Sequence, residues 1–394
     1  MPDEPLKPIL PKRERPLPAG TRPALAPPPP RRTLLMGRPM HFASIDQRPG
    51  GPGASRPAAF RSKIDRDLAF KQWHKLAELL SERGFEVMAI HAEKKFPALA
   101  FAGAAGLLLD RGQSNPVESK TFITATPTHG EPELHQQFER VIRGIGFQAE
   151  SLDGHFAGAA DFIKCGDNYL FTPGADIDAP GIPLGGLRLP SFLGGRSARG
   201  QWGSEPRVRE QLSELVPDSE IIELRITDPR FPRGDLVCHP IGPGRKMLMV
   251  YVKAFHDDAR ALLLSRKSKV AEYLIPIEDA DASLYAANSF QFTEKGDKHY
   301  LVIPEGVSKE LLRRIEAVGV TPIPVELSEW IKKDRGSVRS LITDLGWVRT
   351  DRRTEPHVGD FRRSLRFVPS EPTIPAPLAQ SDAEEGVSHR ATRG

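Results

Sequence analysis

A five-residue segment occurs twice in the chain and sets the spacing of its structural units. Phe101-Ala102-Gly103-Ala104-Ala105 returns 55 residues later as Phe156-Ala157-Gly158-Ala159-Ala160, and each copy leads into a predicted strand pair with a tight turn, at 110–112 and at 166–168. A related step at 286–290 opens a third hairpin, which turns at 294–297. Self-similarity at a fixed spacing indicates a fold built from repeated units. Each unit has room for two or three strands and one helix.

Amphipathic helices complete these units. Apolar residues at helical spacing follow Asp65 and stop at Gly84, which predicts a helix over 65–83 and then a strand over 85–90. The same succession predicts helices at 132–143, 207–216, 257–269 and 308–318, and strands at 147–151, 220–227, 236–241, 247–252 and up to Val325. Five such units fit between residues 34 and 348, starting near 41, 101, 156, 235 and 288. The pattern predicts an α/β fold in which five helix-backed units form a ring, an α/β propeller with a ligand site on its axis.

Both ends of the chain have a different composition. Eleven of the 38 prolines fall in residues 1–30, and residues 1–40 carry eight basic against three acidic side chains, which leaves the remainder at a net charge of −1. We therefore expect a disordered basic arm over 1–32, one folded domain over 33–350 and a largely disordered extension over 351–394. The arm is either a solvated tail or a ligand for a protein partner. The stretch 175–205 is either a lid or a surface loop.

The composition argues against several classes of protein and function. The chain is 39% hydrophobic and 27% charged, contains two cysteines and has no apolar run near the length of a membrane helix. These features predict a cytoplasmic protein without a membrane partner or a disulfide scaffold, and the near-neutral body does not favour nucleic-acid binding. No nucleotide loop, zinc spacing or flavin fingerprint is present, so no cofactor and no metal is expected. The run His256-Asp257-Asp258 is interpreted as a helix start.

Three segments, in this order and spacing, carry a family resemblance. Residues 36–42 (MGRPMHF), residues 224–231 (LRITDPRF) and the last unit from 288 to 341 resemble the opening strand, the approach to a catalytic His-x-Asp motif and the final stretch of the pentein superfamily. This superfamily comprises amidinotransferases, arginine deiminases and dimethylargininases, and the resemblance covers about 34–348. It implies a five-unit propeller and an enzyme in which a thiolate attacks a guanidinium carbon, a histidine moves protons and carboxylates hold the guanidinium group.

Most of that catalytic set has changed in this chain. The resemblance places the nucleophilic cysteine of the family at Ser340, its histidine at Arg233, an acid of the second unit at Ala98 and the glutamate of the third unit at Ala157. A serine hydroxyl is a weak nucleophile without an adjacent base, and a guanidinium with a pKa above 12 cannot accept a proton. We therefore expect the covalent chemistry to be lost or severely reduced.

Two carboxylates of the family pattern remain, Asp161 and Asp235. They either bind a guanidino or amino-acid ligand or form hydrogen bonds within the chain. Arg233 carries the head group of the family substrate, so it could reach Asp161 or Asp235 and fill the site from within, and free arginine would then bind poorly. Three functions stay open: a catalytically degenerate protein with a binding or regulatory role, an active hydrolase or amidinotransferase that uses Ser340 in a rearranged site, and a scaffold that works through residues 1–32.

The cysteines and one histidine are further candidates. On a strand through this region, Cys238 would point away from the face that Arg233 and Asp235 share, and Cys165 would lie at a hairpin turn. Both are interpreted as buried or incidental. His239 would share the Asp235 face, as a substitute base or as a polar strand residue.

Overall fold

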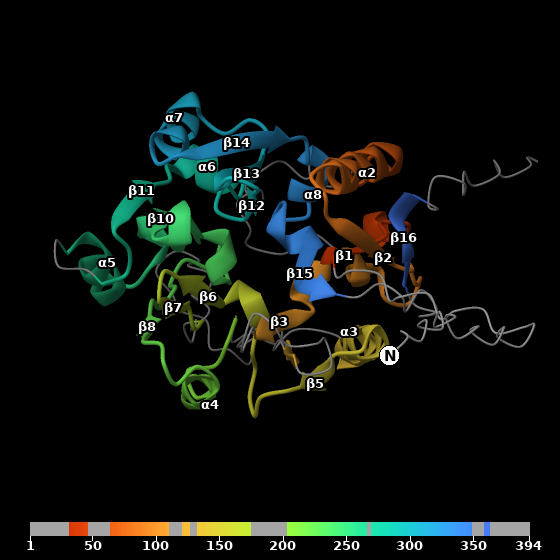
Figure 1. The fold of residues 1–394 in the computed structure, drawn as a ribbon, viewed down its shortest axis with the longest axis horizontal. Coiled ribbons are helices and arrows are strands. Elements are labelled where there is room, and N and C mark those ends of the chain that lie inside the picture. The colour runs from red at the N-terminus through yellow and green to blue at the C-terminus, as the bar shows by residue number, and fades with distance from the viewer. Residues whose placement is uncertain are drawn as a thin grey trace, which may run out of the picture.

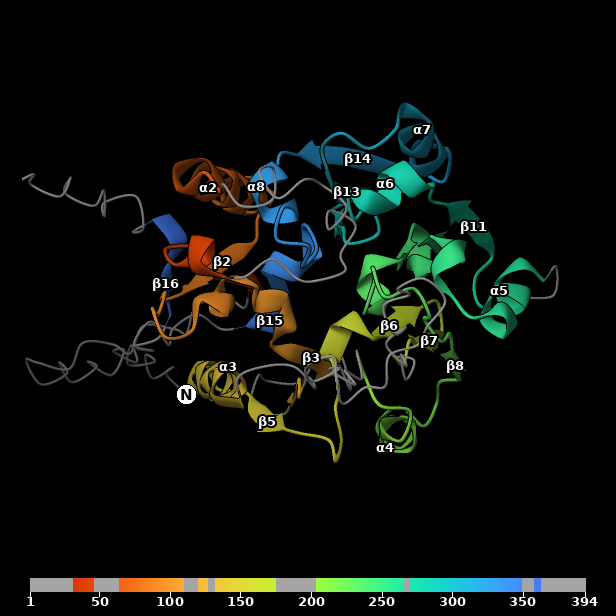
Figure 2. The same ribbon diagram turned by 180° about the vertical axis from the view of Figure 1, so that it is seen from behind.

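The computed structural model describes residues 31–45, 64–109, 120–126, 132–174, 203–265, 269–348 and 358–362. Their fold is a mixed α/β arrangement of five small sheets that follow one another around the middle of the molecule (Figure 1). The major helices lie at the periphery, and they do so again in the view from behind (Figure 2). No helix among the described residues has the length and apolarity that crossing a membrane requires. The predicted turn at 110–112, the 175–202 part of the predicted loop and the ends of the chain lie outside the described residues.

Each sheet has the same internal topology, in which an inner strand pairs antiparallel with a middle strand and the middle strand pairs parallel with an outer strand. The inner strands are β15 (Ile342–Val348), β3 (Gly106–Leu109), β6 (Phe162–Cys165), β9 (Cys238–Ile241) and β12 (Phe290–Glu294). The middle strands are β1 (Arg31–Gly37), β4 (Thr121–Thr124), β7 (Asn168–Phe171), β10 (Met247–Val250) and β13 (Lys298–Pro304). The outer strands are β2 (Glu86–Ile90), β5 (Gln148–Glu150), β8 (Ile221–Glu223), β11 (Tyr273–Pro276) and β14 (Val320–Val325).

One helix joins the middle strand to the outer strand in every sheet. These helices are α2 (Arg66–Glu82), α3 (Pro132–Ile145), α4 (Val208–Leu215), α5 (Asp257–Leu264) and α7 (Lys309–Ala317). All five were predicted, and the predicted caps form: the carboxylate of Asp65 accepts a hydrogen bond from the Leu68 N–H, and the Ser308 hydroxyl accepts one from the Leu311 N–H. Helix α5 ends at Leu264, before the predicted position 269, because Ser265 has an extended backbone.

The first sheet is closed by the two ends of the folded chain. Strand β15, near the C-terminus, pairs with β1, near the N-terminus, with Leu35 opposite Thr343. Strand β1 starts at Arg31, two residues inside the predicted arm. Strand β16 (Val358–Asp360) pairs antiparallel with β2 and lies inside the predicted disordered extension. Three residues are too few to show a strand pattern, so this strand could not be predicted.

Other differences from the predicted elements are local. Strand β8 covers only part of the predicted 220–227, and Ile226 forms isolated bridges instead. The predicted strand 236–241 starts at Cys238, because a 3₁₀ turn takes up 234–236. The short helices α6 (Asp279–Ser283) and α8 (Ser328–Ile331) were not predicted, since neither is long enough to show a helical period.

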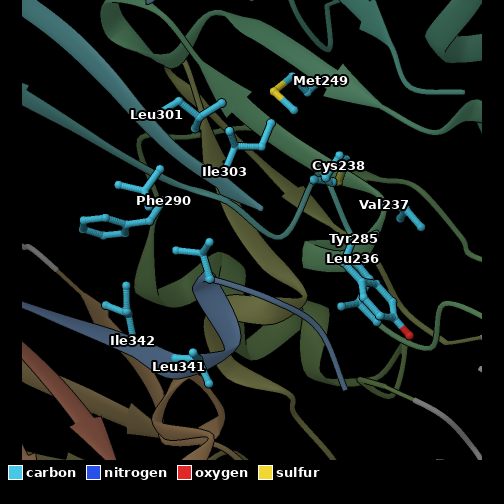
Figure 3. Packing of buried hydrophobic residues seen from close by; sticks show 14 of the residues in the cluster. Leu236, Val237, Cys238, Met249, Tyr285, Phe290, Leu301, Ile303, Leu341 and Ile342 are labelled. Atoms are coloured by element: carbon cyan, nitrogen blue, oxygen red, sulfur yellow. The ribbon is translucent and has the colours of Figure 1, made fainter. Parts of the chain in front are cut away.

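The core is contributed by all five sheets. Its largest cluster includes Leu236, Cys238 and Tyr285, which lie near one another in Figure 3. The indole of Trp330 packs on Phe42 with 4.1 Å between ring centroids. Its indole N–H donates to the backbone oxygen of Ala69 at 3.1 Å, so α8 is attached to α2.

A short turn precedes every inner strand, and we call these segments the inner turns. Four are 3₁₀ turns: η3 (Ala102–Ala104), η5 (Gly158–Ala160), η6 (Gly234–Leu236) and η9 (Arg339–Leu341), and the fifth is 286–289. Their backbones touch: a Cβ on Gly103 would lie 2.4 Å from the Arg339 carbonyl oxygen, and a Cβ on Gly158 would lie 2.6 Å from the Gly106 Cα. The repeated Phe-Ala-Gly-Ala-Ala segment is therefore the sequence of two inner turns, where glycine permits the close approach.

Candidate functional site

The inner turns bring together the predicted site residues. Asp161 follows η5, Asp235 lies in η6 and Ser340 lies in η9, and all three side chains are buried. Hydrogen bonds connect them through neighbouring groups, because the Gly234 N–H donates to Asp161 at 2.9 Å and Asn288 contacts both Asp235 and Ser340. The site is thus assembled from corresponding positions of successive units.

Arg233 lies across this site. Its Nε donates to Asp235 Oδ1 at 3.1 Å, and its Nη2 lies 3.1 Å from both Ser340 Oγ and the Arg335 carbonyl oxygen. The side chain of Asp235 is 4% exposed and that of Arg233 is 25% exposed. The guanidinium of Arg233 therefore connects the carboxylate and the hydroxyl of two different units.

Asn288 is a site residue that sequence reasoning missed. Its Nδ2 donates to Asp235 Oδ2 at 2.8 Å, and its Oδ1 accepts from the N–H groups of Ser337 and Ser340 at 2.7 and 3.1 Å. Both carboxylate oxygens of Asp235 thus have a donor within this chain. The signal that could have identified Asn288 is its place in the repeat, because 286–290 was recognised as a related step.

Asp161 is fully buried and is surrounded by donors of the chain itself. Its Oδ2 accepts from the Ser204 N–H at 2.7 Å and the Ser204 hydroxyl at 2.9 Å, and its Oδ1 accepts from the Gly234 N–H at 2.9 Å and the Thr172 hydroxyl at 3.2 Å. Burial raises the pKa of Asp161 to about 6, although these hydrogen bonds oppose the shift. By binding the Gly234 N–H, Asp161 positions the backbone next to Arg233.

The raised pKa of Asp161 predicts a pH dependence of stability. Because its folded-state pKa of about 6 exceeds the usual 3.8, the folded chain binds the proton more tightly than the unfolded chain between these values. The contribution of this group to stability should therefore increase as pH falls from about 6 to about 4, by up to about 3 kcal/mol relative to Asp161→Asn. Denaturant unfolding of both proteins across this pH range measures it, and parallel pH profiles would contradict the prediction.

In the part of the chain that the structure describes, no base is found among the hydrogen-bond partners of Ser340. Its Oγ lies 3.0 Å from Asn288 Oδ1, 3.0 Å from the Arg335 carbonyl oxygen and 3.1 Å from Arg233 Nη2. An amide oxygen, a peptide carbonyl and a guanidinium cannot take up the hydroxyl proton at neutral pH. In this arrangement the hydroxyl is a hydrogen-bonding group.

The other candidates lie elsewhere in the interior. Cys165 ends β6 beside the predicted turn, and burial raises the pKa of its thiol to about 12; burial also raises the pKa of the Cys238 thiol. The strand alternation used to place Cys238 opposite Asp235 was wrong in its premise, because 234–236 forms a 3₁₀ turn. Neither ring nitrogen of His239 has a hydrogen-bond partner among the described residues. His256 is exposed and caps α5, accepting from the Asp258 N–H.

Comparison with known proteins identifies the fold. No protein-family model matches the chain, and no curated protein matches it significantly. Among solved structures, the N-terminal domain of ArgZ, an arginine dihydrolase from the ornithine–ammonia cycle in cyanobacteria, matches with a TM-score of 0.60 and 20% identity over 80% of this chain and 98% of that domain. AgrE in complex with L-arginine matches with a TM-score of 0.61 and 22% identity over 82% of this chain and 40% of the AgrE chain.

A third matching structure belongs to an enzyme with a different activity. A dimethylarginine dimethylaminohydrolase, as an adduct with S-methyl-L-thiocitrulline, matches with a TM-score of 0.54 and 13% identity over 80% of this chain and 99% of that chain. At these identities the likeness concerns the fold. The chain therefore has the fold of these proteins, which is the fold that the resemblance to the pentein superfamily predicted.

Proposed function

We propose that this chain is a catalytically degenerate pentein protein with a binding or regulatory role, in which Arg233 occupies the place of a guanidino substrate. We also propose that its five sheets form an α/β propeller with the inner turns around one end of the axis. The observation that carries the proposal is the contact of one guanidinium with both Asp235 and Ser340.

The residues at the family's reacting positions support this proposal. The resemblance requires a thiolate and a histidine, and this chain has Ser340 and Arg233 there. Activating a serine takes a base that removes its proton, and Arg233 stays protonated at neutral pH. Ser340 already hydrogen-bonds within the chain, so both halves of the covalent route lack their proton carrier.

The two remaining carboxylates are engaged by the chain itself. The Asp161 carboxylate accepts hydrogen bonds from Ser204, Thr172 and Gly234. The Asp235 carboxylate accepts hydrogen bonds from Arg233 and Asn288. A guanidino or amino-acid ligand would have to displace Arg233 to reach Asp235. We therefore expect the unmodified protein to bind free arginine poorly, and we assign Asp161 a positioning role.

An active hydrolase or amidinotransferase is the alternative, and a product-release assay separates the two. Purified protein is incubated with arginine, methylarginines and agmatine, and citrulline, urea and ammonia are measured beside a Ser340→Ala variant. We expect no release above the Ser340→Ala background. Release by the unmodified protein that disappears in Ser340→Ala would overturn the proposal and establish a serine nucleophile.

A scaffold role for residues 1–32, in a cytoplasmic protein, is proposed as compatible with the degenerate site. Its support is compositional, since seven of the 55 basic residues and eleven of the 38 prolines fall within these 32 positions. Removal of residues 1–30, which leaves β1 complete, separates the two roles. Partner binding through the arm should vanish while the stability of the folded domain is unchanged.

A further inference from the structure

A second group of basic side chains, two arginines and one neutral histidine, lies among the inner strands next to the Arg233 site, since Asp235 and Arg233 both act on the charge of its member Arg339. It contains Arg245, in the turn between β9 and β10, Arg339, in η9, and His239, on β9. The nearby Arg32 forms an ion pair with Asp344 at 2.8 Å. Three arginines therefore gather around one carboxylate that is already paired.

Contacts with the third sheet place these residues together. An Nη2 of Arg339 donates to the Ala159 carbonyl oxygen at 2.8 Å, directly before β6. At the other end of β6, the Gly166 N–H donates to the Arg245 carbonyl oxygen at 3.0 Å. Strand β9, which carries His239, contacts β6 between these two points. The guanidinium of Arg339 and the backbone of Arg245 thus lie at opposite ends of β6, and the two side chains are close enough to repel each other.

His239 is the unsatisfied member of the group. It is 1% exposed, and both of its ring nitrogens lack a hydrogen-bond partner in the described structure. A buried imidazole almost always has at least one partner. Burial and the fields of Arg339 and Arg245 keep the pKa of His239 well below 6.5, so the ring is neutral and offers one N–H donor.

Arg245 also lacks a partner for its charge. Within the described part of the chain, its guanidinium makes no hydrogen bond and no ion pair. Both Asp344 oxygens are used, one by Arg32 and the other by the Gly346 N–H. Burial lowers the pKa of Arg245 to about 10; the repulsion of Arg339 adds to this shift, and the attraction of Asp344 opposes it.

We propose that Arg245, Arg339 and His239 form a binding site for a small oxyanion inside the ring of inner strands. Two guanidinium groups offer charge-assisted hydrogen bonds, and the imidazole offers a neutral donor. Arg245 follows Gly242-Pro243-Gly244 directly and has φ of 56°, a conformation that glycine adopts more easily. Arg245 and Arg339 are both partly exposed.

Calorimetric titration of inorganic phosphate into the full-length protein tests the proposal, with sodium chloride at matched ionic strength as the reference. We expect saturable binding and a rise in Tm that chloride does not produce. Arg245→Gln should weaken phosphate binding by about 10- to 100-fold, because it removes a charged donor. Lys246→Gln is the matched control, since Lys246 follows in the same turn but pairs with Glu272 at the surface.

Two further measurements keep the result interpretable. The imidazole nitrogen resonances of His239, assigned with His239→Gln, should shift on phosphate addition in the unmodified protein and not in Arg245→Gln. A parallel titration with acetate distinguishes a site for tetrahedral oxyanions from one that also takes a carboxylate. Absence of saturable binding of either ion, or equal binding by the Arg245→Gln and Lys246→Gln variants, would overturn the proposal.

Discussion

Replacing Asp235 by alanine is expected to lower the free energy of unfolding by about 3–5 kcal/mol, because it leaves a largely buried guanidinium without its counter-charge. Asp235 is 4% exposed and accepts from both Arg233 and Asn288, so two donors lose their acceptor at once. Chemical denaturation of the purified variants measures the effect.

A surface pair provides the control for the Asp235 variant. Glu272 and Lys246 are 61% and 47% exposed, and Glu272→Ala should cost less than about 1 kcal/mol. Adding Arg233→Met to Asp235→Ala should restore part of the lost stability, since the unpaired charge is then removed. An Asp235→Ala protein as stable as Glu272→Ala would show that Arg233 and Asp235 are not paired.

Gly336→Ala should be strongly destabilising, because it places a methyl group against Ser340 and Asn288. Gly336 has φ of 116°, and a Cβ there would lie 2.1 Å from Ser340 Oγ and 2.8 Å from Asn288 Oδ1. Backbone strain and overpacking each cost about 1–3 kcal/mol, so we expect a loss of about 2–6 kcal/mol in unfolding free energy.

Two further variants distinguish the steric clash of a Cβ at position 336 from the backbone strain at the same position. Gly296 also has a positive φ, of 82°, but a Cβ there meets no atom within 4 Å, so Gly296→Ala should cost only the strain of its backbone. In the Gly336→Ala background, Ser340→Ala should recover stability because the contact at 2.1 Å is replaced by one at 3.1 Å to the Ser340 Cβ. If the changes in unfolding free energy of Gly336→Ala and Ser340→Ala simply add in the double variant, the Ser340 hydroxyl does not lie where the structure places it.

Much of the fold was predictable because each unit carries its own pattern. The repeated segments mark inner turns, and amphipathic helices such as α2 and α7 show periodicity and caps in sequence alone. Strand β16 could not be predicted, since its three residues depend on pairing with β2. The turn at 234–236 was predicted in part as strand, because its conformation depends on Asp161, 73 residues earlier, binding the Gly234 N–H.

The candidate site was predictable in its members but not in its connections. The resemblance predicted that Arg233 could contact Asp161 or Asp235. Arg233 pairs with Asp235 because the donors of Ser204, Thr172 and Gly234 already surround Asp161. Residue type in a single sequence does not show which donors already satisfy a carboxylate. The role of Asn288 is likewise invisible in the sequence, because Asn288 connects η6 with η9, two turns that are far apart along the chain.

Calorimetric titration of methylguanidine tests most directly whether Arg233 fills a guanidinium site. The unmodified protein, Arg233→Ala and Arg225→Ala are compared at ligand concentrations too low to denature; Arg225 is the control because it is a half-exposed arginine that pairs with Glu223 at the surface. We predict saturable binding and a rise in Tm for Arg233→Ala alone, since the ligand replaces the missing side chain between Asp235 and Ser340. Equal binding by the unmodified protein, or no binding by a folded Arg233→Ala protein, would contradict the account.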